Sequence, residues 1–334
     1  MYYLLGLSLA LAALLAFNAA ASGAAALLWR IVRSRAAAWP APARAQVLFA
    51  LRVLPFAFSA ALVCALVLPA YFEHEPRHGG EHVGAGLAAL VVLSASGLAL
   101  AARRGLASWL ATRRLVRDWL FAARPVRLDG APVTAFRIEH PFPVIALVGA
   151  LRPRLFIAAQ VLDALTPAEL RAAVAHECGH LAARDNLKRA LTRACRDALS
   201  PLPFGRALDR AWAEEAERAA DEFAAGERPR VALDLASALV KIARLAPAGA
   251  RPAVYASSFI IDEADANVAE RVRRLARLAS HGAASAPPAR GPRPASLLWL
   301  GASACLAALI FASTHERVLL AAHELIEQSV RLLR

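Results

Sequence analysis

The chain has 334 residues, of which 58% are hydrophobic, with 39 basic and 26 acidic side chains. This length allows a membrane part plus one globular domain. Nearly all the basic residues are Arg and Ala is heavily used, so we interpret the positive charge as a composition bias. No RNA- or DNA-binding motif accompanies it, and the sequence therefore predicts no direct nucleic-acid partner.

Four uncharged runs are each about as long as a helix that crosses a hydrocarbon core of roughly 30 Å. Their length disfavours the alternative of buried core helices in a soluble protein. The first run lacks a basic start and is too long for a signal peptide, so we interpret it as a retained span. The predicted spans are residues 2–28, 53–72, 83–102 and 296–313.

Arginines flank these runs unevenly, and this predicts the orientation of the chain. They gather between the first two runs and after the third, whereas the loop at 73–82 holds a single Arg77. By the positive-inside rule, the N-terminus and this loop face outward from a bacterial inner membrane. The predicted parts are three membrane helices (1–104), a cytoplasmic domain (105–280), a Pro- and Ala-rich linker (281–295), a fourth span (296–313) and a short external amphipathic tail (314–334).

The outward loop "EHEPRHGGEH" (73–82) carries three histidines among three glutamates. Such a set can bind a metal ion or respond to pH. An ordinary solvated loop is the alternative that its polar composition favours.

Three short runs early in the cytoplasmic domain have the composition of β-strands. They cover 132–139, 144–149 and 154–159, and Pro and Gly separate them. The "LRP" between the last two indicates a hairpin-like turn.

A helix is predicted to start at Thr166, with Pro167 in its first position and Glu169 completing a capping box. Its packing stripe is Leu170, Val174, Cys178 and Leu181, which gives Cys178 a packing role. Further helices are predicted at 207–225, 231–245 and 263–279.

The predicted helix contains His176, Glu177 and His180 in the H-E-x-x-H pattern. Two histidines four residues apart share one helix face and can bind one Zn²⁺, beside which Glu177 can take a proton from water. Glu217 can supply a third ligand, and Asp221, one turn later, can hydrogen-bond the outer nitrogen of a histidine ligand. The alternative is a solvated polar helix face, which the capped helix and the preceding strands disfavour.

The segments "LTPAELRAAVAHECGHLAARDN", "EAERAADEFA" and "NVAERVRRL" resemble the M56 family of BlaR1-like membrane zinc peptidases and the related M48 family of Ste24- and HtpX-like peptidases. The "HLAARDN" continuation and the layout of the spans are more similar to M56. The resemblance implies an α-helical membrane protein with a mainly α, α+β gluzincin-like peptidase domain. In it, His176, His180 and Glu217 bind zinc and Glu177 is the general base.

The chain departs from these families in two places. After the last span it has no room for the penicillin-binding sensor domain of BlaR1-like receptors, so β-lactam sensing is not expected. The M48 relatives have a histidine before the "ER" segment that is absent here. By resemblance, Arg271 can stabilise the oxyanion instead; a structural ion pair with a nearby acid is an equal alternative.

Three functions remain open from the sequence. The first is an endopeptidase that cleaves a cytoplasmic protein, such as a transcriptional repressor in a signalling pathway. The second is a quality-control protease for membrane proteins. The third is a non-catalytic zinc-binding signalling protein, which the intact Glu177 disfavours. For a peptidase, the strand at 154–159 is predicted to offer an edge to which an extended substrate adds.

Overall fold

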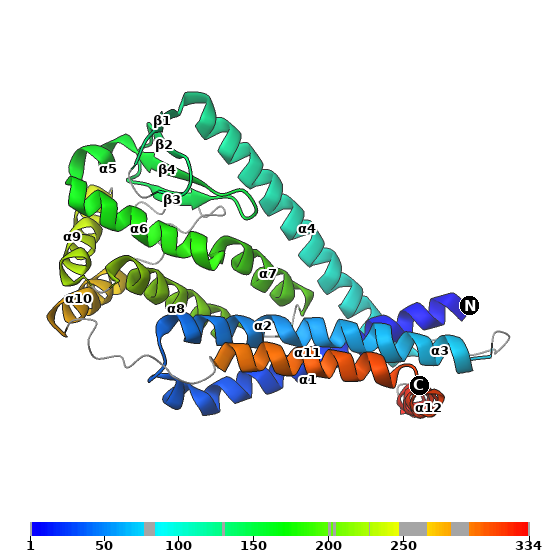
Figure 1. Cartoon of the computed structure of the whole chain (residues 1–334). Helices are drawn as coiled ribbons and strands as arrows, with labels where there is room; N and C mark the ends of the chain where they lie inside the picture. Colours follow the sequence, from blue (N-terminus) through cyan, green and yellow to red (C-terminus); the bar gives the residue numbers. More distant parts are fainter. Residues whose placement is uncertain are drawn as a thin grey trace.

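The computed structural model describes residues 2–76, 84–128, 131–199, 202, 205–226, 228–246, 266–281 and 294–332. Long apolar helices form one part of the molecule, and a small sheet with six further helices forms the other (Figure 1). The predicted helix at 263–279 corresponds to α10 (Ala266–His281), with 263–265 outside the described residues. Most of the predicted 281–295 linker, and His78, Glu81 and His82 of the outward loop, also lie outside them.

Three helices are long and apolar enough to cross a membrane, as predicted. They are α1 (Tyr2–Ala36), the run from α2 (Ala41–Leu62) through the π-helical turn η1 (Val63–Val67) to α3 (Leu68–His74), and α4 (Ala85–Ala122). The π-helical turn ends two residues before Pro69, whose ring nitrogen has no hydrogen for the regular helical bond. Each helix extends beyond its predicted span, and α4 crosses the predicted boundary at residue 104.

The fourth predicted span corresponds to α11 (Pro294–Ala312), which qualifies as a span only together with α12 (Glu316–Leu332). The two helices are bent by 96° at their junction. The predicted amphipathic tail is therefore a helix that turns sharply away from α11. It buries Leu319 and Val330 and contacts α3 and η1.

A four-stranded sheet with the order β1-β2-β4-β3 begins the second part of the chain. Its strands are β1 (Arg124–Val126), β2 (Ala135–Ile138), β3 (Ile145–Val148) and β4 (Arg154–Ala158). The last three were predicted, and the short β1 was not. The expected hairpin joins β3 to antiparallel β4. Gly149 begins its turn at φ +110°, where a side chain would be strained and its Cβ would lie 3.0 Å from the Arg152 carbonyl oxygen.

The prediction that β4 offers a free edge is wrong. β4 pairs in parallel with β2 on one side and antiparallel with β3 on the other. The parallel pairing places β2 where we expected an edge, because the chain leaves β2, forms β3, and returns between them. The edges of the sheet are β1 and β3.

Six helices follow the sheet: α5 (Ala159–Ala164), α6 (Pro167–Ala183), α7 (Asp185–Ala198), α8 (Arg206–Ala225), α9 (Pro229–Leu245) and α10. The capping box of α6 is present: the Thr166 hydroxyl accepts from the Glu169 N–H, and the Glu169 carboxylate accepts from the Thr166 N–H. The predicted stripe of α6 packs on the core beneath the sheet, and Cys178 is one of its packing residues.

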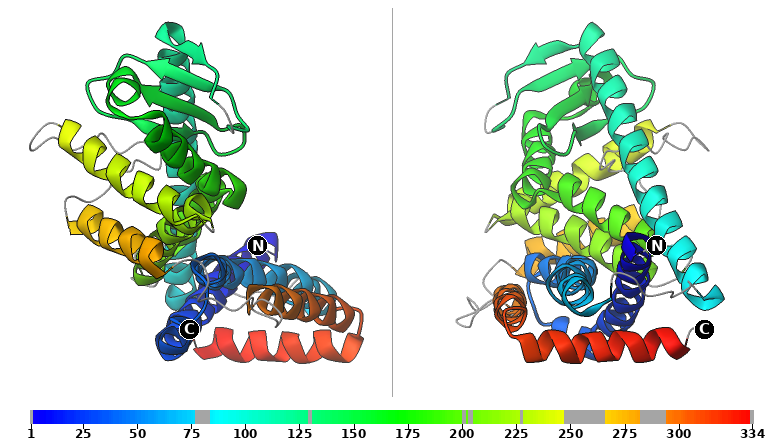
Figure 2. Two further views of the ribbon diagram at one scale, coloured as in Figure 1. Left: turned by 60° about the vertical axis from the view of Figure 1, so that its left-hand side comes forward. Right: turned by 90° about the vertical axis from the view of Figure 1, so that its right-hand side faces the viewer.

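The long apolar helices hold the second part of the chain directly, because α8 packs along α2 and α7 packs along α4 (Figures 1 and 2). Leu48 of α2 is buried against Trp212 of α8. Two ion pairs flank this apolar contact: Arg44–Glu215 at 2.7 Å and Arg52–Asp209 at 2.8 Å. The α8 helix is thereby fixed to the long apolar helix α2 along much of its length.

Candidate active site

His176 and His180 lie on one face of α6 and are buried. Their spacing of four residues places the two rings one above the other, with the Nε2 atoms 3.2 Å apart. The rings are nearly perpendicular, at 87°. Both Nε2 atoms therefore converge on one small volume beside the helix.

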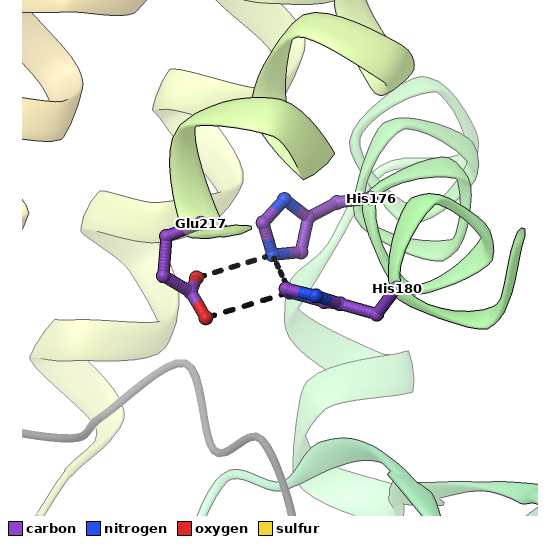
Figure 3. A group of neighbouring side chains, drawn as sticks. All are labelled: His176, His180 and Glu217. Carbon is purple, nitrogen blue, oxygen red and sulfur yellow. Dashed lines mark hydrogen bonds and ion pairs between the residues drawn. The ribbon is translucent and has the colours of Figure 1, made fainter. Parts of the chain in front are cut away.

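Glu217 reaches the same volume from α8 (Figure 3). Its Oε2 lies 3.5 Å from Nε2 of His176, and its Oε1 lies 3.4 Å from Nε2 of His180. The helices come this close because Gly179 faces Ala220, where an added Cβ would lie 3.0 Å from the Ala220 Cα. A side chain at 179 would require α6 and α8 to move apart by a few tenths of an ångström.

The three ligand atoms fit a tetrahedral zinc ion. With bonds of about 2.1 Å, the ligands of such an ion lie about 3.4 Å from one another. The observed separations are 3.2, 3.4 and 3.5 Å. Two imidazoles and one carboxylate are also a donor set that zinc takes in catalytic sites, where a fourth position is kept for water.

The outer nitrogens of both histidines face carboxylates. Nδ1 of His176 lies 2.9 Å from Asp221, as the sequence suggested, and Nδ1 of His180 lies 2.8 Å from Asp185. A carboxylate in this place fixes the proton on Nδ1 and directs Nε2 toward a metal. The bend at Arg184 (φ 55°) brings Asp185 back to His180.

Arg271 of α10 contacts the acidic residues of the site. Its guanidinium lies 2.7 Å from Asp221 and 3.2 Å from Glu217, and Nη2 is 3.5 Å from Nε2 of His176. Arg274 pairs with the other oxygen of Asp221. Of the two alternatives for Arg271, the structure contains the ion pair, and the oxyanion role stays a prediction.

Glu177 is buried between α6 and strand β3. Its Oε2 accepts a hydrogen bond of 3.2 Å from the Leu147 N–H, whereas Oε1 has no hydrogen-bond partner among the described residues. Burial raises the pKa of this carboxyl group above its usual range. The arrangement orients one oxygen through the strand and leaves the other able to take a proton.

Asn186 was not singled out from the sequence, although it directly follows Asp185. Its side-chain amide donates to the Leu147 carbonyl at 2.9 Å and to the Gly149 carbonyl at 3.0 Å. Glu177 and Asn186 thus both bind the outer edge of β3. They fix the strand against the helix that carries the histidines.

Acidic groups around the histidines favour a positive charge between them. Burial lowers the pKa of His180, but the Glu217 and Asp185 carboxylates outweigh this and raise the pKa to about 10. Burial raises the pKa of Glu217, whereas His180, His176 and Arg271 bring it well below the usual range. The surrounding carboxylates thus stabilise a positive charge at His180.

Comparison with known proteins identifies a family for this chain. The family model described as "Peptidase family M48" matches residues 122–315, which include both histidines and Glu217. The match covers more than half of the chain. No curated protein and no protein of known structure matches it.

Proposed function

The chain belongs to peptidase family M48, and we propose that it is a membrane-associated zinc endopeptidase. The observation that carries the proposal is the convergence of three ligand atoms at 3.2–3.5 Å from one another, with the Glu177 carboxylate beside them. This arrangement supports hydrolysis more than a structural metal site, since a structural zinc ion commonly has four protein ligands.

His176, His180 and Glu217 would hold the metal ion. When bound, zinc would polarise the scissile carbonyl group and make a water molecule acidic. Glu177 would accept the proton of that water at Oε1, with Oε2 held by the Leu147 N–H. It would then donate the proton to the departing amine, which is general acid–base catalysis by one carboxyl group.

An extended substrate would lie along the edge of β3. In an antiparallel pair, the backbone N–H and C=O groups of successive residues point alternately toward and away from the partner strand. The Val144 carbonyl accepts from the Ala158 N–H on the β4 side, so the backbone groups of Ile145 and Leu147 point to the outer edge of β3. The backbone N–H and C=O of Leu147 are already hydrogen-bonded to Glu177 and Asn186. A substrate strand would therefore pair with the part of the β3 edge at Ile145. β3 contacts α6, and a strand added there would place a peptide bond beside the zinc ligands.

The substrate is proposed to be a protein at or near the membrane. Three or four helices fit a membrane, and α8, which carries Glu217, is fixed to one of them. The quality-control alternative rests on the resemblance to M48, and the family match is to M48. The arginine distribution favours a cytoplasmic site for the reaction.

A comparison of protein N-termini in cells tests this function. Cells would express the wild type, Glu177→Gln or Glu214→Gln, the last being a matched change at an exposed glutamate of α8. We expect new N-termini with the wild type and with Glu214→Gln, and none with Glu177→Gln. Identical profiles for the wild type and Glu177→Gln, at equal protein levels, would contradict the proposal. The identity of the cleaved proteins would separate quality control from repressor cleavage.

A further inference from the structure

A second group of metal-ligand side chains lies where α3 ends against α12. Figure 1 places α12 near the end of α3 and the N-terminus, at the opposite end of the helical bundle from α10. Figure 2 shows α12 crossing beneath the other membrane helices. The site around His176 lies between α6 and α8 and shares no residue with this group.

Glu75, His323 and Glu327 make up this group, which we call the α3–α12 cluster. Each offers one ligand atom, and these atoms lie within 4.8 Å of one another. His323 and Glu327 are four residues apart on α12, so they share a face of the helix. Glu75 directly follows the last residue of α3, so the cluster joins segments at opposite ends of the chain.

His74 adds a fourth candidate ligand beside the cluster. Its ring packs edge-on against His323, with centroids 5.8 Å apart. Nε2 of His74 and Nδ1 of His323 are both buried without a hydrogen-bond partner among the described residues. A buried ring nitrogen without a partner loses its hydrogen bond to water, and a metal ion would compensate for this loss.

We propose that the α3–α12 cluster binds a divalent transition metal ion, with Zn²⁺ as the fitting ion. The imidazole nitrogens suit zinc better than calcium or magnesium, which take oxygen ligands, and carboxylates also bind zinc. Ligands of tetrahedral zinc lie about 3.4 Å apart. Binding therefore requires the three side chains to close by about 1–1.5 Å, which small side-chain rotations provide.

The role of such an ion would be to fix α12 to the end of α3. The helix follows a bend of 96° and has few buried side chains, with Leu319 and Val330 among them. A metal bridge closes a loop of more than two hundred residues, which restrains the unfolded chain more than a short loop does. The cluster is thus a structural site that the zinc peptidase chemistry does not require.

Zinc binding by the purified full-length chain tests this inference. Glu327→Gln removes one ligand, and Glu324→Gln is the matched control, since Glu324 is an exposed glutamate on the same helix outside the cluster. All proteins carry Glu177→Gln to prevent self-cleavage. Bound zinc is measured by equilibrium dialysis and elemental analysis.

We expect Glu327→Gln to bind about one zinc ion fewer per chain than Glu324→Gln, and Glu75→Gln to do the same. The comparison is a difference between variants, so it holds whatever the occupancy of the site around His176. Circular dichroism shows whether each variant keeps its helices. Equal zinc contents in folded Glu327→Gln, Glu75→Gln and Glu324→Gln would overturn the proposal.

Discussion

Replacing Asp185 tests whether the carboxylate behind His180 orients it toward the metal. Asp185 is buried, and its Oδ2 lies 2.8 Å from Nδ1 of His180. In Asp185→Asn the side chain keeps an oxygen that can accept from Nδ1 but loses its charge. In Asp185→Ala the side chain loses both the acceptor oxygen and the charge. Neither change removes a proposed zinc ligand, so the variants isolate the effect of orientation.

The expected loss of zinc affinity follows from the number of interactions that each Asp185 variant loses. Residues that hydrogen-bond a metal-bound histidine typically affect metal affinity by about 10- to 100-fold. Because the amide retains an acceptor, we expect about tenfold weaker zinc binding for Asp185→Asn, or about 1.4 kcal/mol. We expect about 100-fold weaker binding for Asp185→Ala, or about 2.8 kcal/mol.

Competition with a chromophoric zinc chelator measures the zinc affinities of purified Asp185→Asn and Asp185→Ala. Asp163→Asn is the matched control, because Asp163 is an exposed aspartate at the end of α5. His180→Gln gives the effect of losing a ligand. If Asp185→Ala binds zinc as the wild type does while His180→Gln does not, the contact between Asp185 and His180 has no orienting role.

Three further expectations follow from the structure. In Arg271→Gln the ion pair with Asp221 is lost, so zinc affinity should fall; Arg271→Lys should restore it in part. A loss of kcat in both variants with unchanged zinc affinity would instead favour the oxyanion role. Asn186→Asp removes the donors to β3, so the free energy of unfolding, measured by denaturant titration, should fall by about 1–3 kcal/mol; an unchanged value would contradict the account of the β3 edge. Burial raises the pKa of Glu169, but its bonds to Lys241, Ser237 and Thr166 lower it to about 2. Its contribution to stability is therefore present above about pH 4.5 and is lost as the pH falls toward 2. Glu169→Gln should reduce this part of the acid dependence and lower stability by about 1 kcal/mol at neutral pH; an unaltered acid profile would count against it.

Local features of the sequence predicted the core of the site. The capping box at Thr166 sets where α6 begins, and the spacing of His176 and His180 then requires a shared face. Both depend only on residues within one helix. Glu217 was predicted from its pattern on a second helix, and the structure places it beside the histidines because Gly179 allows α8 to approach.

The contacts around the site could not be read from the sequence, because they depend on pairing between distant segments. Arg271 meets Asp221 across 50 residues of chain. Asp185 reaches His180 only because Arg184 adopts a left-handed conformation that its residue type rarely takes. The same bend starts α7, a helix that the sequence analysis did not separate from α6.

Strand order was the part of the fold where sequence reasoning was wrong. The runs at β2, β3 and β4 indicate strands, but nothing local in them shows that β4 returns between the other two. A parallel pair such as β2 and β4 leaves no turn signature, unlike the hairpin of β3 and β4. Which strand forms an edge of the sheet could therefore be identified only from the structure.

The most direct test of the account measures bound zinc and peptide hydrolysis in the same samples. Purified wild type, Glu177→Gln, His180→Gln and Glu214→Gln would each be assayed with a library of quenched fluorescent peptides. We expect Glu177→Gln to keep the zinc of the wild type and to lose hydrolysis, and His180→Gln to lose about one zinc ion and hydrolysis together. Glu214→Gln should match the wild type in both. Hydrolysis by Glu177→Gln at the wild-type rate, or zinc retained in full by His180→Gln, would contradict the assignment of this site.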